Sequence, residues 1–173
     1  MATQTEYPLL TAREFLEIEF GEHKAELDNG VIRMMAGGTA RHARVQFNLI
    51  LALGSRLRGT GCTPYGPDMG VETHDRSIRY PGVTVYCGRD DVEDDEAKAF
   101  NDPRVIFEVL SAGTARTDLR VKLPEYTALP SVETIAFVDM SANGSASSSV
   151  PGPADGASRP TTSPSTSRSL HWV

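Results

Sequence analysis

One acidic residue, Glu108, interrupts the otherwise apolar run "VIFEVL" at residues 105–110. A continuous apolar run of this length is typical of a strand that is covered on both faces of its sheet. A carboxylate buried there is costly unless a cation, a metal ion or strong hydrogen-bond donors compensate its charge. The alternatives are a glutamate that faces solvent on a half-exposed strand and one that is held by an arginine, and this stretch alone leaves them open.

Lys122 is the candidate partner of Glu108. It follows fourteen residues later, in the segment "DLRVKLPEYTAL", which predicts a helix that returns over the sheet. A lysine beside a metal-bound carboxylate can stabilise a developing anion or orient water, as hydrolytic chemistry requires. A surface lysine is the alternative, and Asp118 is then a simple helix cap. Because Pro124 would kink an established helix, a later helix start that leaves Lys122 in a loop is also open.

Two further acids and one histidine are candidates for the same site. Glu26 precedes the turn at Asn29 and Gly30, and Asp68 lies in "YGPDMGV", where a strand is expected to begin. Taken alone, each is more often a turn or edge residue. His42, at the start of a predicted helix, is a candidate base or phosphate contact, or a histidine that satisfies the helix end. The common nucleotide-binding, zincin and serine-hydrolase signatures are absent from the chain.

Gly82 opens the stretch "GVTVYC", which otherwise reads as a buried strand. Glycine weakens a strand interior and marks a bulge, a tight bend or a close approach of two backbones. The residues around it therefore predict an irregular start of this strand.

The elements that position these residues follow from capping signals and apolar periodicity. Thr11 and Glu14 form a capping box for a first helix, and Asn29-Gly30 suits a hairpin turn. Helices are predicted at 12–20, 40–58 and 118–129, and strands at 25–28, 31–35, 62–65, 68–73, 79–86, 105–111 and 133–139. This order predicts an α/β or α+β fold with a central mixed sheet flanked by helices.

Composition divides the 173 residues into a domain at 1–140 and a Ser/Pro/Gly-rich tail at 141–173. The tail has too few apolar residues to offset its ordering entropy and is predicted to be disordered. The acidic run at 89–102 predicts a solvated loop, since it lacks the features of an EF-hand. A net charge of −6 argues against nucleic-acid coating by bulk charge but permits a local basic cleft.

The chain contains two cysteines, Cys62 and Cys87, which are far apart and form no C-x-x-C motif. They are predicted to be buried free thiols, which fits a reducing compartment. The N-terminus does not have the pattern of a signal peptide, and no apolar run approaches the ~18 residues that span a bilayer. A soluble, cytoplasmic protein without membrane contact is expected.

In order, the stretches "AELDNGVI", "ARHARVQFNL", "YGPDMGV", "YPGVTVYCG", "VIFEVLSAGTARTDLRVKLPEY" and "LPSVETIAFVD" resemble the Uma-type endonucleases. These belong to the PD-(D/E)XK, or restriction-endonuclease-like, superfamily. The resemblance covers roughly residues 8–140. It implies a restriction-endonuclease-like core that hydrolyses nucleic-acid phosphodiester bonds with Mg²⁺ or Mn²⁺. DNA is the expected substrate, and a homodimer is expected because cutting two strands needs two sites.

The resemblance also implies roles for single residues. Glu108 matches the metal-binding acid on the central strand, Lys122 the lysine that has moved to the following helix, and Glu26 the acid before the hairpin. Asp68 matches an aspartate that the family has at the start of a strand, and it is expected to be a second metal ligand. Gly82 stands where the family has a metal-binding aspartate, so one ligand is expected to be lost.

Three readings follow. The chain is a metal-dependent nuclease with an incomplete site, or a catalytically inactive nuclease-fold protein that serves as a binding or interaction module. The third is a structural α/β protein whose acids are solvated. The family usually continues into further strands where this chain has its tail from Ser141, which a frameshift would explain.

Overall fold

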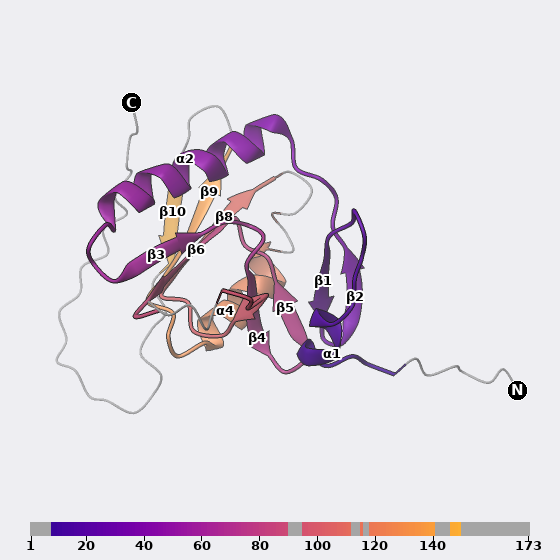
Figure 1. Cartoon of the computed structure of the whole chain (residues 1–173). Coiled ribbons are helices and arrows are strands. Elements are labelled where there is room, and N and C mark those ends of the chain that lie inside the picture. The colour runs from indigo at the N-terminus through magenta and orange to yellow at the C-terminus, as the bar shows by residue number, and fades with distance from the viewer. Residues whose placement is uncertain (1–7, 90–94, 112–114, 116–117, 141–145, 150–173) are drawn as a thin grey trace, which may run out of the picture.

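The structure is a computed structural model that describes residues 8–89, 95–111, 115, 118–140 and 146–149. In this part of the chain the strands form two five-stranded sheets, and helices pack beside them (Figure 1). The predicted fold class, a mixed sheet with flanking helices, is confirmed, although the strands divide between two sheets instead of one. None of the helices described combines the length and hydropathy needed to cross a bilayer.

The sheet that carries Glu108, here called the central sheet, has the strand order β10-β9-β8-β6-β3. Strands β8 and β9 are parallel, and the other neighbours are antiparallel. Because parallel neighbours need a crossover connection, the chain leaves the sheet after β8 and returns through a helix. That crossover contains Lys122. The strands are β3 (Cys62–Tyr65), β6 (Val83–Cys87), β8 (Val105–Leu110), β9 (Thr134–Asp139) and β10 (Ala146–Ser149).

The second sheet, here called the N-terminal sheet, has the order β2-β1-β5-β4-β7. Asn29 (φ 49°) and Gly30 (φ 82°) form the turn between β1 and β2. Two positive φ values are the requirement of a type I′ hairpin turn, which confirms the predicted hairpin. The strands are β1 (Ala25–Asp28), β2 (Val31–Met34), β4 (Gly70–His74), β5 (Ser77–Arg79) and β7 (Ala99–Phe100).

Helix α1 (Ala12–Leu16) begins at the predicted capping box, with Glu14 N donating to Thr11 Oγ1 and Thr11 N donating to the Glu14 carboxylate. It ends before residue 20, where the sequence predicted its end. The carbonyl of Leu16 accepts a hydrogen bond from Lys98 Nζ at 2.9 Å instead of continuing the helix.

Helix α2 (Ala40–Arg56) agrees with the predicted helix at 40–58 and lies along the central sheet (Figure 1). Helix α4 (Leu123–Ala128) follows a π-helical turn at Asp118–Lys122. Pro124 lies in the first turn of α4, where backbone N–H groups have no intrahelical partner, so it does not break the helix. Lys122 therefore lies on helical backbone and not in a loop.

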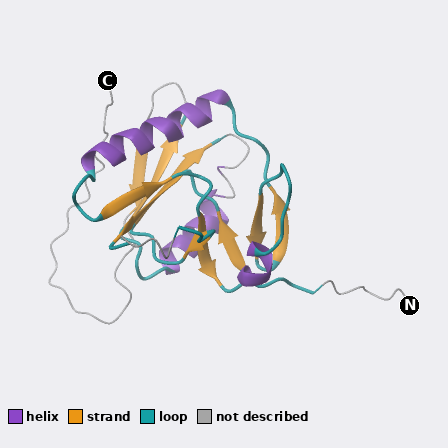
Figure 2. Ribbon diagram, viewed as in Figure 1, coloured by secondary structure: helices purple, strands orange, loops and turns teal. Residues whose placement is uncertain are grey.

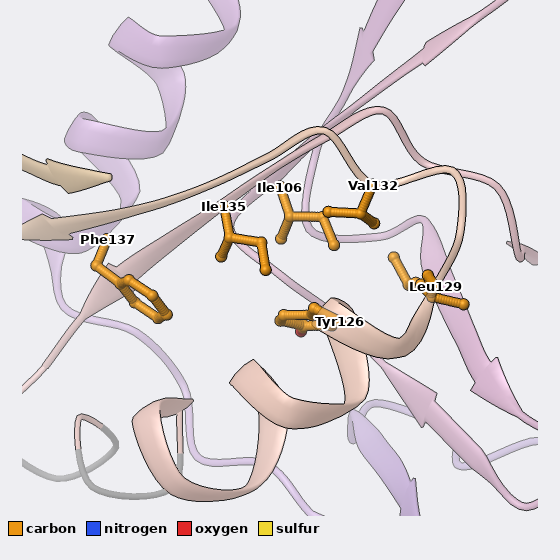
Figure 3. Close-up of a cluster of buried hydrophobic side chains, with 7 residues drawn as sticks. Ile106, Tyr126, Leu129, Val132, Ile135 and Phe137 are labelled. Carbon is orange, nitrogen blue, oxygen red and sulfur yellow. The ribbon is translucent and has the colours of Figure 1, made fainter. Parts of the chain in front are cut away.

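The largest apolar cluster fills the space between α4 and the central sheet (Figure 3). Tyr126 and Leu129 pack against Ile106 of β8 and against Ile135 and Phe137 of β9. Ile106 and Ile135 are directly paired in the parallel register, so they present one continuous surface to the helix. This packing fixes α4, and with it Lys122, relative to the strand that carries Glu108. The helices and strands that form this arrangement are distinguished by colour in Figure 2.

Cys62 and Cys87 form a disulfide between β3 and β6, so the prediction of free thiols is wrong. The two residues face each other directly in the antiparallel register, with Cα atoms 3.9 Å apart. The two cysteines are 25 residues apart, and β4 and β5, which lie between β3 and β6 in sequence, belong to the other sheet. No pattern in the sequence therefore indicated that β3 and β6 are neighbours. The cysteines therefore do not support a reducing compartment.

Two predicted irregular segments contain short strands. Residues 146–149, where composition predicted a disordered tail, form β10 and pair with β9. Ala99 and Phe100, in the predicted acidic loop, form β7 beside β4. The remainder of the tail and residues 90–94 lie outside the described residues.

Reduction of the disulfide is expected to destabilise the fold. Closing a loop of this length contributes about 3 kcal/mol through the entropy of the unfolded chain. Thermal unfolding of the native protein should therefore shift to lower temperature when TCEP is added. A Cys62→Ser, Cys87→Ser double variant is the control and should not respond to TCEP. An equal response of both proteins would contradict a disulfide.

Candidate active site

Glu26, Glu108 and Lys122 meet in the interior, although they come from three separate segments. Lys122 Nζ lies 2.8 Å from Glu26 Oε1 and 3.6 Å from Glu108 Oε1. The three residues are only 7%, 5% and 6% exposed, respectively. Glu26 belongs to the N-terminal sheet and Glu108 to the central sheet, so the Lys122 ammonium links the two sheets.

Tyr126 holds the carboxylate of Glu108 from the side of α4. Its hydroxyl donates a hydrogen bond of 2.7 Å to Glu108 Oε1. Burial, and next the nearby Glu108 charge, raise the pKa of Tyr126 well above its usual value, so the hydroxyl stays protonated and remains a donor. Tyr126 follows Lys122 by four residues and so lies one helical turn away on the same side. That spacing was the available signal for this residue, which the sequence analysis did not select.

Glu26 is held by the strand segment that precedes Gly82. The backbone N–H of Tyr80 donates to Glu26 Oε1 at 3.0 Å, and Arg79 Nη1 lies 3.6 Å from Glu26 Oε2. Glu26 thus has neighbours on both oxygens, from Tyr80 and Lys122 on one and from Arg79 on the other. These three neighbours fix the position of the Glu26 carboxylate.

Arg79 is the centre of a second buried group of charges, which the sequence analysis missed. Its side chain is 1% exposed and donates to both oxygens of Glu125, at 2.6 and 2.7 Å, and to Asp28 at 2.8 Å. Thr73 adds a hydrogen bond to Glu125. Burial lowers the pKa of Arg79, but the bonds to Glu125 and Asp28 outweigh it and raise the pKa overall. The only signal in the sequence was a lone arginine in the predicted strand at 79–86.

The remaining sequence candidates lie elsewhere. The Asp68 side chain is 85% exposed and forms its ion pair with Lys24, so it does not join Glu26 and Glu108. His42 Nε2 lies 3.1 Å from the carbonyl oxygen of Val109, next to Glu108 along β8. This histidine therefore connects α2 to the end of β8.

Gly82 lies immediately before β6, whose first residue, Val83, pairs with Phe107 of β8, the residue before Glu108. A Cβ atom on Gly82 would lie 3.0 Å from Val109 Cγ2, 3.1 Å from the Phe107 carbonyl oxygen and 3.4 Å from Gln46 Nε2. These distances confirm a close approach of neighbouring groups, one of the predicted reasons for glycine. A side chain here fits only if the neighbours shift by a few tenths of an ångström.

The site supplies few ligands for a metal ion. Among the described residues, no group of three or more His, Cys, Asp or Glu side chains could hold one. Glu26 and Glu108 offer two carboxylates near one ammonium. Mg²⁺ is often bound by one or two carboxylates together with water and substrate phosphates. The residues therefore fit a cation that a substrate phosphate completes, and not one that the protein holds alone.

The pairing of Asp28 with Arg79 is expected to make stability depend on pH. Burial raises the pKa of Asp28, but the hydrogen bonds and charge of Arg79 outweigh it and lower the pKa below its usual value. A lowered carboxylate pKa stabilises the fold above the unfolded-state value, and this stability is lost as the pH falls through the folded-state value. Asp28→Asn should cost about 2 kcal/mol at pH 7, and the deficit should shrink in acid.

Urea unfolding at pH 7 and at pH 3 measures this difference. Asp68→Asn is the matched control, because Asp68 is exposed and should change stability by no more than about 0.5 kcal/mol at either pH. A deficit of Asp28→Asn that is the same at both pH values would contradict the assigned ion pair.

Comparison with known proteins identifies relatives across most of the chain. Over 133 residues, 76% of this chain and 75% of the relative, it is 30% identical to the uncharacterized protein sll1609 of Synechocystis. A crystal structure from Anabaena variabilis, of a putative nuclease belonging to DUF820, superposes with a TM-score of 0.66. That match covers 82% of this chain and 80% of the other at 15% identity, so it supports the fold alone.

Residues 12–156 match the profile of the Uma2 family, whose description is "Putative restriction endonuclease". The match contains the segments that carry Glu26, Glu108 and Lys122, and it extends beyond residue 140 through β10. This chain therefore belongs to the Uma2 family.

Proposed function

We propose that this protein binds nucleic acid and hydrolyses its phosphodiester bonds slowly, at a restriction-endonuclease-type site that lacks one metal-binding carboxylate. The observation that carries the proposal is the convergence of Glu26, Glu108 and Lys122 at one buried point. Membership of the Uma2 family supports a nuclease-like function and a nucleic-acid substrate. The proposed substrate is DNA. The proposed active form is a homodimer.

Each residue of the site has a distinct task in this proposal. Lys122 Nζ lies between Glu26 and Glu108, where an ammonium can stabilise the negative charge that develops on a phosphate or orient an attacking water. Tyr126 and Arg79 hold the two carboxylates in place, as the hydrogen bond to Glu108 and the contact with Glu26 indicate. Glu108, with Glu26 beside it, is the proposed anchor for Mg²⁺ or Mn²⁺. The ion, when bound, activates water and neutralises developing charge.

Gly82 is the proposed reason for low activity. An aspartate at this position would add a carboxylate at the start of β6, next to the strand that carries Glu108, whereas glycine offers only its backbone. Asp68 does not replace it, since its side chain is exposed and paired with Lys24. Binding of the cation then depends on the substrate phosphate.

A nucleic-acid-binding or interaction module without hydrolysis is the second candidate. It is favoured by the burial of Glu26, Glu108 and Lys122, each less than a tenth exposed. In that case the three residues act only as an internal ion-pair group that joins the two sheets. The two candidates differ in the expected effect of a carboxylate at position 82, which should increase metal binding and cleavage only if the protein is a nuclease.

Gly82→Asp is expected to strengthen Mg²⁺ binding by about 100-fold, because a lost metal ligand costs at least as much as a lost supporting contact. Isothermal titration calorimetry in the absence of nucleic acid measures this affinity. Gly82→Ala is the matched control, since it adds the same crowded Cβ beside Val109 and Phe107 without a carboxylate. Equal affinities of the Asp and Ala variants would exclude position 82 as a ligand position.

Plasmid cleavage with Mg²⁺ or Mn²⁺ tests the chemistry itself. The native protein should cleave slowly, Gly82→Asp should cleave faster by about tenfold or more, and Glu108→Ala should abolish cleavage in both backgrounds. Lys122→Met should do the same if its ammonium acts on the phosphate. If neither the native protein nor Gly82→Asp cleaves plasmid, single-stranded DNA or RNA, the proposed hydrolysis is wrong.

A further inference from the structure

Helix α2 and its flanks concentrate positive charge in an acidic protein. Residues 39–58 contain four arginines and no Asp or Glu, while the whole chain has a formal charge of −6. Arg41 and Arg44 lie in the first half of the helix, and both are exposed. A local positive field of this kind attracts polyanions even when the total charge is negative.

The first half of α2 also contacts the strand that carries Glu108. His42 contacts the Val109 carbonyl with its Nε2 at 3.1 Å, and the Gln46 side chain lies 3.4 Å from where a Cβ on Gly82 would be. Val109 directly follows Glu108 on β8. This part of the helix therefore lies against the strand that carries Glu108, on the side of Val109, whereas the Glu108 side chain faces α4.

The exposed side of α2 carries two large apolar side chains. Phe47 is 63% exposed and Leu51 is 61% exposed. Together with Arg44 they follow a spacing of three and four residues, so the three side chains share one side of the helix. No residue of α2 is fully buried. This side of the helix, defined by Arg44, Phe47 and Leu51, is here called the outer face.

Charge decides which partner suits the outer face. A second copy of this chain, packed through the same face, would bring two helices together that carry arginines and no acidic residue, and like charges disfavour such a contact. Nucleic acid matches the face better. Arginine contacts phosphates, and an exposed aromatic ring such as that of Phe47 can stack on an unpaired base.

We propose that the bound nucleic-acid strand runs along the outer face of α2, with Arg41 and Arg44 at phosphates and Phe47 against a base. This inference rests on the proposed function, since it assigns a binding surface to the substrate of that site. It predicts a preference for single-stranded over duplex DNA, because a base must be unpaired to stack on Phe47.

Fluorescence anisotropy with a labelled single-stranded DNA oligonucleotide in EDTA tests the path without any cleavage. Arg44→Glu should weaken binding by about tenfold, and Arg44→Ala should reduce the salt dependence of log Kd by about one phosphate contact. Phe47→Ala should weaken binding of the single strand by about tenfold and affect the duplex less. Circular dichroism confirms that each variant is folded.

Arg13→Glu is the matched control, with the same charge change on the exposed side of α1, away from α2 (Figure 1). It should leave Kd nearly unchanged. Equal losses for Arg13→Glu and Arg44→Glu would overturn the assigned path and leave only non-specific attraction. Sedimentation that shows a native dimer lost in Phe47→Ala, with DNA binding unchanged, would assign the outer face to a second copy.

The cleavage assay keeps this inference separate from the proposed function. Cleavage by Gly82→Asp that does not depend on Arg44 would overturn the path but not the nuclease chemistry. Arg44-dependent binding with no cleavage by Gly82→Asp would overturn the chemistry but support the path.

Discussion

The structure depends on the requirement that buried charges be compensated. Glu26 of the N-terminal sheet and Glu108 of the central sheet are both buried, and one ammonium, that of Lys122, lies between them. Removal of a single partner from such a group is strongly unfavourable, because it leaves an uncompensated charge in the interior. The position of the crossover after β8, the packing of α4 and the approach of the two sheets are therefore coupled through this contact. The same coupling places three chemically capable groups at one point.

The elements and most of the site were predictable from sequence where the signal is local. The capping box of α1 and the turn at Asn29-Gly30 are patterns over a few residues, and the structure contains the expected element at each. The isolated Glu108 is also a local pattern, but it left burial and exposure open, and the structure shows burial. The disulfide and the Arg79 group were not predictable. They depend on which distant strands become neighbours, and β4 and β5 leave the central sheet between Cys62 and Cys87.

Gly82 illustrates how two constraints can act on one position. Its neighbours Val109 and Phe107 leave little space for a Cβ, so glycine relieves crowding at the start of β6. The family resemblance, in contrast, expects a carboxylate there. Where a side chain is absent, neighbouring groups can occupy its space. Reintroducing a side chain at such a position then costs free energy through overpacking. Local crowding and loss of a ligand are thus compatible explanations of the same residue.

The contact between Lys122 and Glu26 joins residues that are 96 positions apart in the chain. A contact between such distant residues carries a larger loop-closure cost than a local contact does. Neither the α1 region, nor the β1–β2 hairpin, nor the central sheet alone contains the set of charges. A nascent or partly folded chain therefore has no assembled site, and any chemistry that this protein performs on nucleic acid begins only after synthesis has passed the crossover.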